Sequence, residues 1–451
     1  MAVELGAGGV TPEQVVLIAR GADVELAPGA LDAVAAARTV VDDAVAAGAA
    51  VYGLTTRLGE GRDDRLDTAE LAAFQRRVIA NHRGGAGEPL VPEYVRATLA
   101  ARVAVLLNGG SGVRPELVTA AVSLLRREEL PAVPSLGSVG AADLTVLAEL
   151  LAALVDDGFE PAAGEAAAFL SSNALSVGVG SVLLDRLEGV ARGADRAVAL
   201  TLEALAHHGR GGSLTPFDHA VQQAHPVPGQ IASAERIRSL TRDVAVLHDQ
   251  RERSVQDPLS VRTAPQVNGA LLDLIGRLRE QLALELASRS ENPLVDAASG
   301  RTLSGGNFAI TSLVLTVESL RLALAHVAAA SERRIALLSE LQRPFRADGR
   351  SRLPGLSWYA AADALAELRQ LAAPVSLGAS VLSGVEDTAS FGPAALRLLE
   401  RSIALSTVVL SVEALHGVEL VRLAGRTHPW SEHLDADAAS AGVAVGALLV
   451  E

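Results

Sequence analysis

The sequence predicts a mainly α-helical protein with a central bundle of long helices and a mixed N-terminal part. Alanine, leucine and valine dominate a chain that is 49% hydrophobic, and aromatic residues make up only 3% of it. Alanine and leucine are strong helix formers, whereas the aromatic and β-branched residues typical of strands are scarce apart from valine. Several stretches of the C-terminal half also keep a helical spacing of apolar residues over many turns.

The N-terminal part combines helical stretches with loops rich in glycine. Helices are expected at 30–49, 68–81, 92–107 and about 165–186. Residues 51–67 contain too many glycines and charges for regular structure, so we expect a long functional loop there. Glycine and proline punctuate residues 131–143, and Asp143 is well placed to be the N-cap of the apolar helix that follows.

The C-terminal part is dominated by long helical patterns. A loop-like segment that contains histidine and glycine spans residues 207–230. After it, helices are expected at 231–253, 264–287, 311–341, 360–373 and 393–423. Helices of this length with few strand signals indicate a bundle of nearly parallel helices, which could also pack between subunits. We therefore expect a mixed N-terminal domain at 1–200 and a long-helix bundle domain at 201–451.

Charge and composition argue against several classes of function. The net charge of −14 disfavours broad binding of nucleic acids or anionic membranes, because both need a cationic face. All 39 basic residues are arginine, so no lysine is present for a Schiff base or a Walker A phosphate site. Cysteine is absent, which excludes disulfides and thiolate chemistry. We find neither a secretion signal nor an uninterrupted run of roughly 20 apolar residues, and we expect a cytoplasmic protein.

Motifs for other common chemistries are weak. His207 and His208 are adjacent and cannot both face one metal ion from a helix, so we expect no metal site. The glycine-rich stretches do not follow strand-like runs, as a dinucleotide site would require. The pairs Arg76-Arg77, Arg126-Arg127 and Arg333-Arg334 are most simply solvated faces or ion pairs.

Ten segments, in one order along the chain, carry a family resemblance. They are VYGLTTRLG, NHRGGAGEP, NGGSGVRPE, PSLGSVGAADL, HPVPGQ, SVQDPLSVRTAPQVNGA, SENPLV, SGGNF, SERR and SGVEDTAS. Together they resemble the aromatic amino acid ammonia-lyase family, which includes the histidine and phenylalanine ammonia-lyases. The resemblance extends from about Pro28 to about Leu423. It implies an ammonia-lyase/fumarase-like fold, a cytoplasmic homotetramer, and active sites shared between subunits.

The resemblance fails where the family forms its cofactor. In that family an Ala-Ser-Gly tripeptide cyclises to an electrophilic methylidene-imidazolone, and the serine supplies its methylene. The family pattern Gly-Ser-Val-Gly-Ala-Ser-Gly-Asp-Leu is here GSVGAADL, with Gly140, Ala141, Ala142 and Asp143 at its centre. One residue is missing, and neither alanine can lose water to form a methylene. We therefore expect a degenerate cofactor loop and no cofactor.

Two other short strings of similar composition are present. Residues 298–300 read Ala-Ser-Gly, but they lie in a polar stretch where the family has an ordinary loop. Residues 110–112 read Gly-Ser-Gly, in a segment that is not the family's cofactor site. A motif needs its structural context, so we expect neither to cyclise.

The resemblance assigns roles to several residues of the substrate pocket. Tyr52 corresponds to the base on the family's mobile lid, although it could simply be a packed loop aromatic. Arg57 replaces a small residue of that lid, and it is either an anion-binding or a solvated side chain. Arg262 matches the arginine that binds the substrate carboxylate, a role that suits its planar fork, although a structural ion pair is the alternative. Gln256 matches a pocket amide or makes a backbone hydrogen bond.

Further pocket positions match only in part. Glu386 matches the carboxylate that faces the substrate's amine or side chain, and Phe308 matches the pocket wall. His82 matches a histidine of the histidine-specific branch. The alternative for Glu386 is a helix-terminal carboxylate, and the alternative for Phe308 is core packing. His82 could instead be a loop histidine with satisfied hydrogen bonds. The family's asparagine falls on Ser171, and Asn173 could replace it only if the backbone shifts.

The departures cluster on the side of the pocket that faces the cofactor. The family's tyrosine after Gln-Asp falls on Leu259. Like the tripeptide serine, it belongs to the cofactor-facing half, whereas the carboxylate-binding half is better retained. The sequence therefore indicates a lyase-type enzyme that works without the family cofactor. It would catalyse elimination, cyclisation or isomerisation of a carboxylate-bearing, amino-acid-like substrate. The alternatives are a non-catalytic ligand-binding or regulatory homologue and an ordinary ammonia-lyase.

Overall fold

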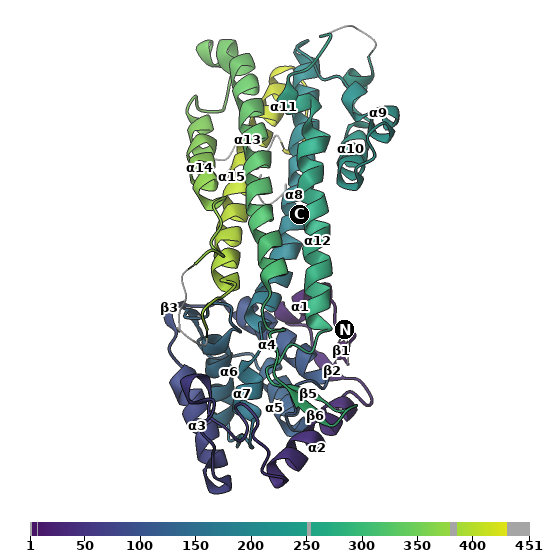
Figure 1. The fold of residues 1–451 in the computed structure, drawn as a ribbon. Coiled ribbons are helices and arrows are strands. Elements are labelled where there is room, and N and C mark those ends of the chain that lie inside the picture. The colour runs from purple at the N-terminus through teal and green to yellow at the C-terminus, as the bar shows by residue number, and fades with distance from the viewer. Residues whose placement is uncertain (1, 7, 250–253, 379–385, 431–451) are drawn as a thin grey trace. The chain divides into compact units, whose positions relative to one another are not determined.

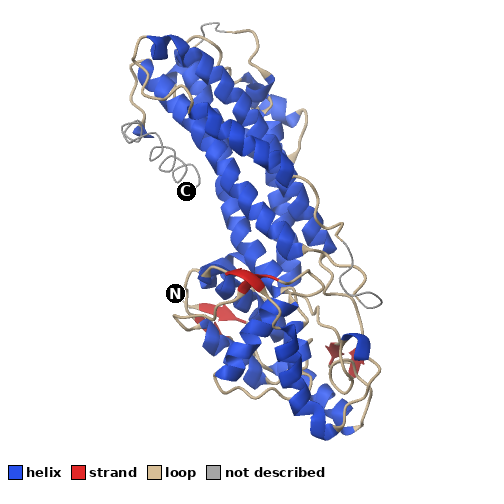
Figure 2. Ribbon diagram, turned by 90° about the vertical axis from the view of Figure 1, so that its left-hand side faces the viewer, coloured by secondary structure: helices blue, strands red, loops and turns tan. Residues whose placement is uncertain are grey.

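The computed structural model describes the chain except for residues 1, 7, 250–253, 379–385 and 431–451, and helices dominate it (Figures 1 and 2). The mainly α prediction is confirmed. In chain order the elements are β1 (Val3–Leu5), α1 (Pro12–Ala19), β2 (Val24–Leu26), α2 (Asp32–Ala46), the 3-10 turns η1 (Gly59–Gly61) and η2 (Thr68–Glu70), α3 (Leu71–His82), β3 (Ala86–Pro89), α4 (Pro92–Leu107), α5 (Pro115–Leu125), β4 (Pro134–Leu136), α6 (Leu144–Asp156), α7 (Glu165–Leu170), α8 (Ala174–His207), η3 (Thr215–Phe217), α9 (His219–Gln223), α10 (Pro228–Thr241), η4 (Ala245–His248), α11 (Leu259–Arg262), α12 (Ala264–Leu286), β5 (Leu294–Asp296), β6 (Arg301–Leu303), α13 (Thr311–Ala347), α14 (Ser357–Leu371) and α15 (Gly392–Leu423).

The chain forms two compact units, and each is built from several segments. The first comprises 1–185, 278–315 and 374–397, and the second comprises 186–277, 316–373 and 398–451. The boundary expected at residue 200 therefore falls inside α8, and α12, α13 and α15 are likewise divided between the units. A division in chain order does not describe this fold, because the C-terminal half supplies two segments to the first unit.

The first unit contains the mixed part of the fold. Its described residues form three two-stranded sheets, namely the parallel pair β1–β2 and the antiparallel pairs β3–β4 and β5–β6. The single helix expected at about 165–186 is divided into α7 and α8, with Ser171, Ser172 and Asn173 between them. This break in the helix lies at the candidate site.

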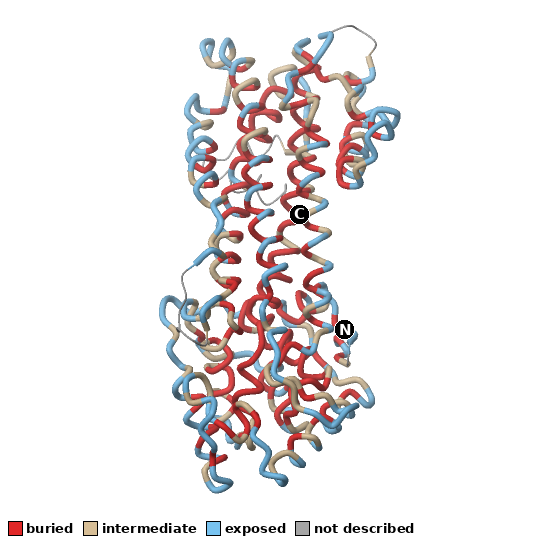
Figure 3. Tube along the Cα trace, viewed as in Figure 1, coloured by how far each residue is buried: buried red, intermediate tan, exposed pale blue. Residues whose placement is uncertain are grey.

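The second unit is a packed set of long helices. Its core joins residues of α8, α10, α13 and α15, and red buried positions run along these helices in Figure 3. Arg334 and Glu413 form a fully buried ion pair in which Nε lies 2.6 Å from Oε1, and Thr201 donates a further hydrogen bond to Glu413. Of the two alternatives expected for Arg333-Arg334, the ion pair applies at Arg334, and it is buried.

Within the ranges that the structure describes, three segments are long and apolar enough to cross a membrane by length and composition, which the sequence alone did not lead us to expect. They are Glu165–His207, Thr311–Ala347 and Gly392–Leu423. Within their most apolar windows, 94%, 61% and 83% of the residues are buried inside the protein. Core packing therefore accounts for the apolar character of the first and third segments, while α13 keeps more of its apolar surface exposed.

Candidate active site

A cavity of about 560 Å³ lies in the first unit. Its walls come from the loop after α2, from α3, from α7 and from the loop that precedes α6. Eight of the residues singled out in the sequence line it together: Tyr52, Arg57, His82, Ala141, Ala142, Ser171, Phe308 and Glu386. The structure thus brings residues from six distant parts of the chain around one space.

Several other singled-out residues do not line this cavity. Ser171 is among the lining residues and Asn173 is not; the Asn173 side-chain amide donates to the carbonyl oxygen of Phe308. Gln256 and Arg262 belong to the second unit. Arg262 ends the short helix α11, and its Nε is buried without a hydrogen-bond partner among the described residues. Its guanidinium therefore retains a free donor.

The loop after α2 holds Tyr52 by backbone contacts. The Tyr52 hydroxyl accepts a hydrogen bond of 3.1 Å from the backbone N–H of Gly59, the first residue of η1. Gly53 has φ +67°, and a Cβ built there would lie 2.8 Å from Leu58 and 2.9 Å from Ala167. Only glycine fits this turn without strain. The loop thus packs against α7 and directs a backbone donor at the phenol oxygen.

His82 is presented in a defined tautomer. It is the last residue of α3, and its Nδ1 lies 2.7 Å from the carbonyl oxygen of Val78. A carbonyl oxygen can only accept, so Nδ1 carries the proton in the neutral ring. His82 Nε2 is then an acceptor, and this side chain lines the cavity.

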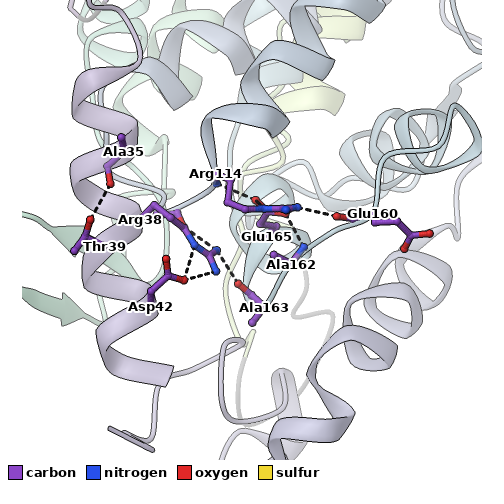
Figure 4. Close-up of polar contacts among 10 residues, drawn as sticks. Ala35, Arg38, Thr39, Asp42, Arg114, Glu160, Ala162, Ala163 and Glu165 are labelled. Atoms are coloured by element: carbon purple, nitrogen blue, oxygen red, sulfur yellow. Dashed lines mark hydrogen bonds and ion pairs between the residues drawn. The ribbon is translucent and has the colours of Figure 1, made fainter. Parts of the chain in front are cut away.

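A network around Glu165 anchors α7, which forms one wall of the cavity (Figure 4). Glu165 is fully buried, and its carboxylate accepts hydrogen bonds from the backbone N–H groups of Arg114 and Ala162. The Arg114 guanidinium adds bonds of 3.0 and 2.8 Å to the two oxygens of the same carboxylate. Beside it, Arg38 pairs with Asp42 and donates to the carbonyl oxygen of Ala163. These bonds satisfy a buried charge, so α7 is fixed at its N-terminus.

A second buried ion pair fixes the other end of α7. Arg102 and Glu291 are both fully buried, with 3.1 Å between Nη1 and Oε1. Arg102 also donates to the carbonyl oxygens of Ala168 and Phe169. The adjacent Ser171 hydroxyl accepts a 2.8 Å hydrogen bond from the backbone N–H of Asn292, another cavity residue. The Arg102–Glu291 pair thus links α7 to the segment that carries Asn292, and both line the cavity.

Asp143 begins α6, as expected, but its carboxylate serves another helix. No side-chain capping bond to α6 forms; instead the carboxylate accepts a 2.9 Å hydrogen bond from the backbone N–H of Ser176, in the first turn of α8. Complete burial raises the pKa of Asp143 to about 7, and the hydrogen bonds from Ser176 oppose that shift. Asp143 therefore ties the loop before α6 to the start of α8.

The loop between Gly140 and Asp143 has a tight and specific backbone. Gly140 and Ala142 close an isolated β-bridge, and the Ser390 hydroxyl donates to the Gly140 carbonyl oxygen at 2.9 Å. Ala142 has φ +62°, a left-handed conformation that favours glycine and costs other residues about 1–2 kcal/mol. The family pattern has glycine at this position, immediately before the aspartate. The loop residues offer only methyl groups to the cavity, and they do not fit the chemistry that forms the family's methylidene-imidazolone.

The other two tripeptide strings lie outside this cavity's lining. Residues 298–300 form the turn between β5 and β6, where Ser299 donates to the Asp296 carboxylate at 2.5 Å. The hydroxyl of Ser111, in the second string, is buried without a hydrogen-bond partner among the described residues.

Sequence reasoning missed Arg77. Arg76 makes an exposed ion pair with Glu160, whereas Arg77 lines the cavity with Phe74, Val78 and Asn81. These four lining residues recur at the spacing of one helix face, which is a signal the sequence does contain. The adjacent arginines therefore have different environments.

Comparisons with known proteins agree with this architecture. The sequence profile of the aromatic amino acid lyase family matches residues 10–159 and 157–441. The chain is 33% identical to a histidine ammonia-lyase of Deinococcus radiodurans, over 89% of this chain and 82% of the relative. It is 35% identical to a probable histidine ammonia-lyase of Halobacterium salinarum, over 91% and 86% of the two chains.

Solved structures share the fold. Histidine ammonia-lyase from Trypanosoma cruzi superposes with a TM-score of 0.84 at 26% identity, covering 100% of this chain and 93% of that one. The ergothioneine-degrading enzyme ergothionase from Treponema denticola, in complex with desmethyl-ergothioneine sulfonic acid, superposes with a TM-score of 0.88 at 23% identity, covering 100% and 98%. By its sequence profile and its relatives, this chain belongs to the aromatic amino acid lyase family.

Proposed function

We propose that this protein is a lyase that acts without the methylidene-imidazolone, on a carboxylate-bearing, amino-acid-like substrate, with Tyr52 as its base. The observation that supports the proposal is the composition of one cavity. Tyr52, His82 and Glu386 line it together with Ala141 and Ala142, where the family pattern has its cofactor-forming tripeptide. The acid–base groups are thus retained beside a loop that lacks the serine.

The chemistry follows from the groups that are present. Tyr52 removes the proton from the carbon next to the one that carries the leaving group. The C–H electron pair becomes the new double bond, and the leaving group departs with the pair of its own bond. The N–H of Gly59 would make a stronger, charge-assisted hydrogen bond to the phenolate form of Tyr52 than to its neutral form. His82 Nε2 and Glu386 are the groups placed to exchange a proton with the departing side.

Without an electron sink, the substrate must bring its own good leaving group. A protonated primary amine can lose an N–H proton to the base and then leaves poorly, whereas a quaternary ammonium has no N–H, keeps its positive charge and leaves as trimethylamine. The structural neighbour ergothionase degrades ergothioneine, and ergothioneine is a betaine with a trimethylated nitrogen beside its carboxylate. That likeness concerns the fold alone, and the leaving-group chemistry is our reason for choosing N-trimethylated amino acids as test substrates.

We also propose that a neighbouring subunit of a cytoplasmic homotetramer brings Arg262 and Gln256 to this cavity. The buried Nε of Arg262 has no partner within the described part of the chain, which suits binding of a carboxylate. Leu315 and Leu322 are half exposed and lie seven residues apart on one face of α13, which suits packing against another subunit. We expect neither nucleic acid nor membrane as a partner.

The first experiment asks whether the electrophile forms. The intact mass should equal the sequence mass, with no loss of two water molecules, and the absorbance band of the imidazolone should be absent. L-Histidine and L-phenylalanine should release no ammonia. A mass short by two waters, or ammonia from either amino acid, would show an ordinary ammonia-lyase and refute the proposal.

The second experiment tests the base. Histidine betaine and ergothioneine are assayed for release of trimethylamine with the wild-type enzyme, Tyr52→Phe and the control Tyr359→Phe, a residue of α14 that is 65% exposed. Loss of a general base costs about 10²–10⁴-fold in turnover, so Tyr52→Phe should lose that much while ligand binding and the control stay unchanged. Ligand binding without turnover in every variant would favour the non-catalytic homologue instead.

A further inference from the structure

Two arginines that the proposed chemistry does not use line the cavity. Arg57 lies on the loop that carries Tyr52, and Arg77 lies on α3, one turn before Asn81. Both are cavity residues, together with Tyr52 and His82. Two positive charges from separate elements therefore border the space where the substrate would lie.

Neither guanidinium has a side-chain partner in the part of the chain that the structure describes. Glu60 also lines the cavity and forms no ion pair with either arginine. The neighbouring Arg76 shows the contrast, because its Nη2 lies 2.5 Å from Glu160. Both arginines are solvent-exposed where they line the cavity, so salt weakens their field, but two unpaired cations at one cavity still favour an anion.

The position of Arg57 is set by its local backbone. Its N–H donates to the Asp64 carbonyl oxygen at 3.0 Å, and Thr56 pairs with Arg65 across the loop. A Cβ built on Gly61 would lie 3.2 Å from Arg57 Cβ and 3.3 Å from Arg57 Cδ. Because Gly61 has no side chain, the aliphatic part of Arg57 packs against it in the loop that lines the cavity.

We infer that Arg57 and Arg77 bind a second acidic group at the far end of the preferred substrate, which makes that substrate a diacid; the single-acid betaines named above are minimal substrates that test only the elimination step. This inference rests on the proposed function, in which Arg262 of a neighbouring subunit takes the first carboxylate. The second group is a carboxylate, sulfonate or similar oxyanion, which a guanidinium recognises through paired N–H donors. Arg57 and Arg77 thereby select the substrate and leave the proton transfer to Tyr52.

The test measures binding and needs no turnover. 3-Phenylpropanoate carries one acid, whereas 3-(4-carboxyphenyl)propanoate and 3-(4-sulfophenyl)propanoate carry a second at the far end. Dissociation constants come from calorimetry on the full-length wild type, on Arg57→Gln/Arg77→Gln, on the charge-preserving Arg57→Lys/Arg77→Lys and on the control Arg76→Gln. Unfolding curves of all four proteins confirm that each is folded.

We expect both diacids to bind the wild type at least about tenfold more tightly than the monoacid, which corresponds to about 1.4 kcal/mol. The double glutamine variant should lose this advantage, the lysine variant should keep part of it, and Arg76→Gln should keep all of it. Equal affinity of the wild type for monoacid and diacids, no binding of the diacids, or an undiminished advantage in the double glutamine variant would overturn the inference. Loss of the proposed elimination chemistry would leave this binding pattern intact, so the two failures are distinguishable.

Discussion

Replacing Arg102 by methionine should be among the most destabilising single changes in the first unit. The change leaves the Glu291 carboxylate buried without its cation, and it removes the donors to the carbonyl oxygens of Ala168 and Phe169. Breaking a buried ion pair on one side costs about 3–5 kcal/mol, a large part of the roughly 5–15 kcal/mol of a typical folded protein. We expect a loss of about 4 kcal/mol in the free energy of unfolding, measured by urea titration.

The pH dependence identifies the cause of that loss. Burial already raises the pKa of Glu291, and removal of Arg102 should raise it further. A carboxyl with a raised pKa in the folded state contributes more stability as pH falls, so the deficit of Arg102→Met should shrink between pH 8 and pH 6. Arg127→Met, which breaks the partly exposed pair with Asp157, is the control and should cost about 0–1 kcal/mol. A deficit of Arg102→Met that is below about 1 kcal/mol, or that does not depend on pH, would refute this reasoning.

Three further changes give separate readouts. Burial lowers the pKa of His416 to about 4 in the folded protein. Below the ordinary histidine pKa of about 6.5, the unfolded chain takes up a proton that the folded protein does not, so the free energy of unfolding falls as pH falls. His416→Gln should therefore remove about 2 kcal/mol of the difference in unfolding free energy between pH 7 and pH 5. The pKa of Asp143, raised to about 7, gives the opposite pH dependence. The free energy of unfolding of the wild type should fall by about 2 kcal/mol relative to Asp143→Asn as pH rises from 5 to 7. If urea titrations show the same pH dependence for both proteins, the raised pKa of Asp143 is wrong. Gly53→Ala places a methyl group against Leu58 and Ala167 at φ +67°. It should lower the free energy of unfolding by about 1–2 kcal/mol and should also lower turnover. An unchanged melting temperature would show that the loop carrying Tyr52 adjusts without strain.

The sequence indicated those parts of the site that reside in contiguous motifs. Tyr52, His82 and Glu386 each lie in a recognisable segment, and the structure brings all three to one cavity. Arg77 was missed because adjacent residues on a helix point about 100° apart, and composition alone does not say which of two neighbouring arginines lines the cavity. The sequence does contain the necessary spacing, since Arg77 and Asn81 are four residues apart.

Contacts between distant residues were beyond the reach of sequence patterns. Arg102 and Glu291 are 189 residues apart, and nothing local to either predicts that they pair. The break between α7 and α8 was also missed, although three consecutive polar residues, Ser171, Ser172 and Asn173, interrupt the apolar pattern there. The hydrogen bond between Ser171 and the backbone of Asn292 is a tertiary contact at this break, and it places the pocket residue Ser171 outside either helix.

The scaffold does not need the missing serine, which explains how the fold and the proposed loss of the cofactor coexist. The loop is held by the Gly140 carbonyl oxygen, which accepts from Ser390, and by the Asp143 carboxylate, which accepts from Ser176. Neither contact uses a side chain between them. Rebuilding Ala-Ser-Gly by Ala142→Ser with a glycine inserted before Asp143 should therefore give a folded protein. We expect no release of ammonia from histidine, because Leu259 and Ser171 leave the cofactor-facing half of the pocket without the family's tyrosine and asparagine. Release of ammonia by this variant would show instead that the tripeptide alone separates this chain from its relatives.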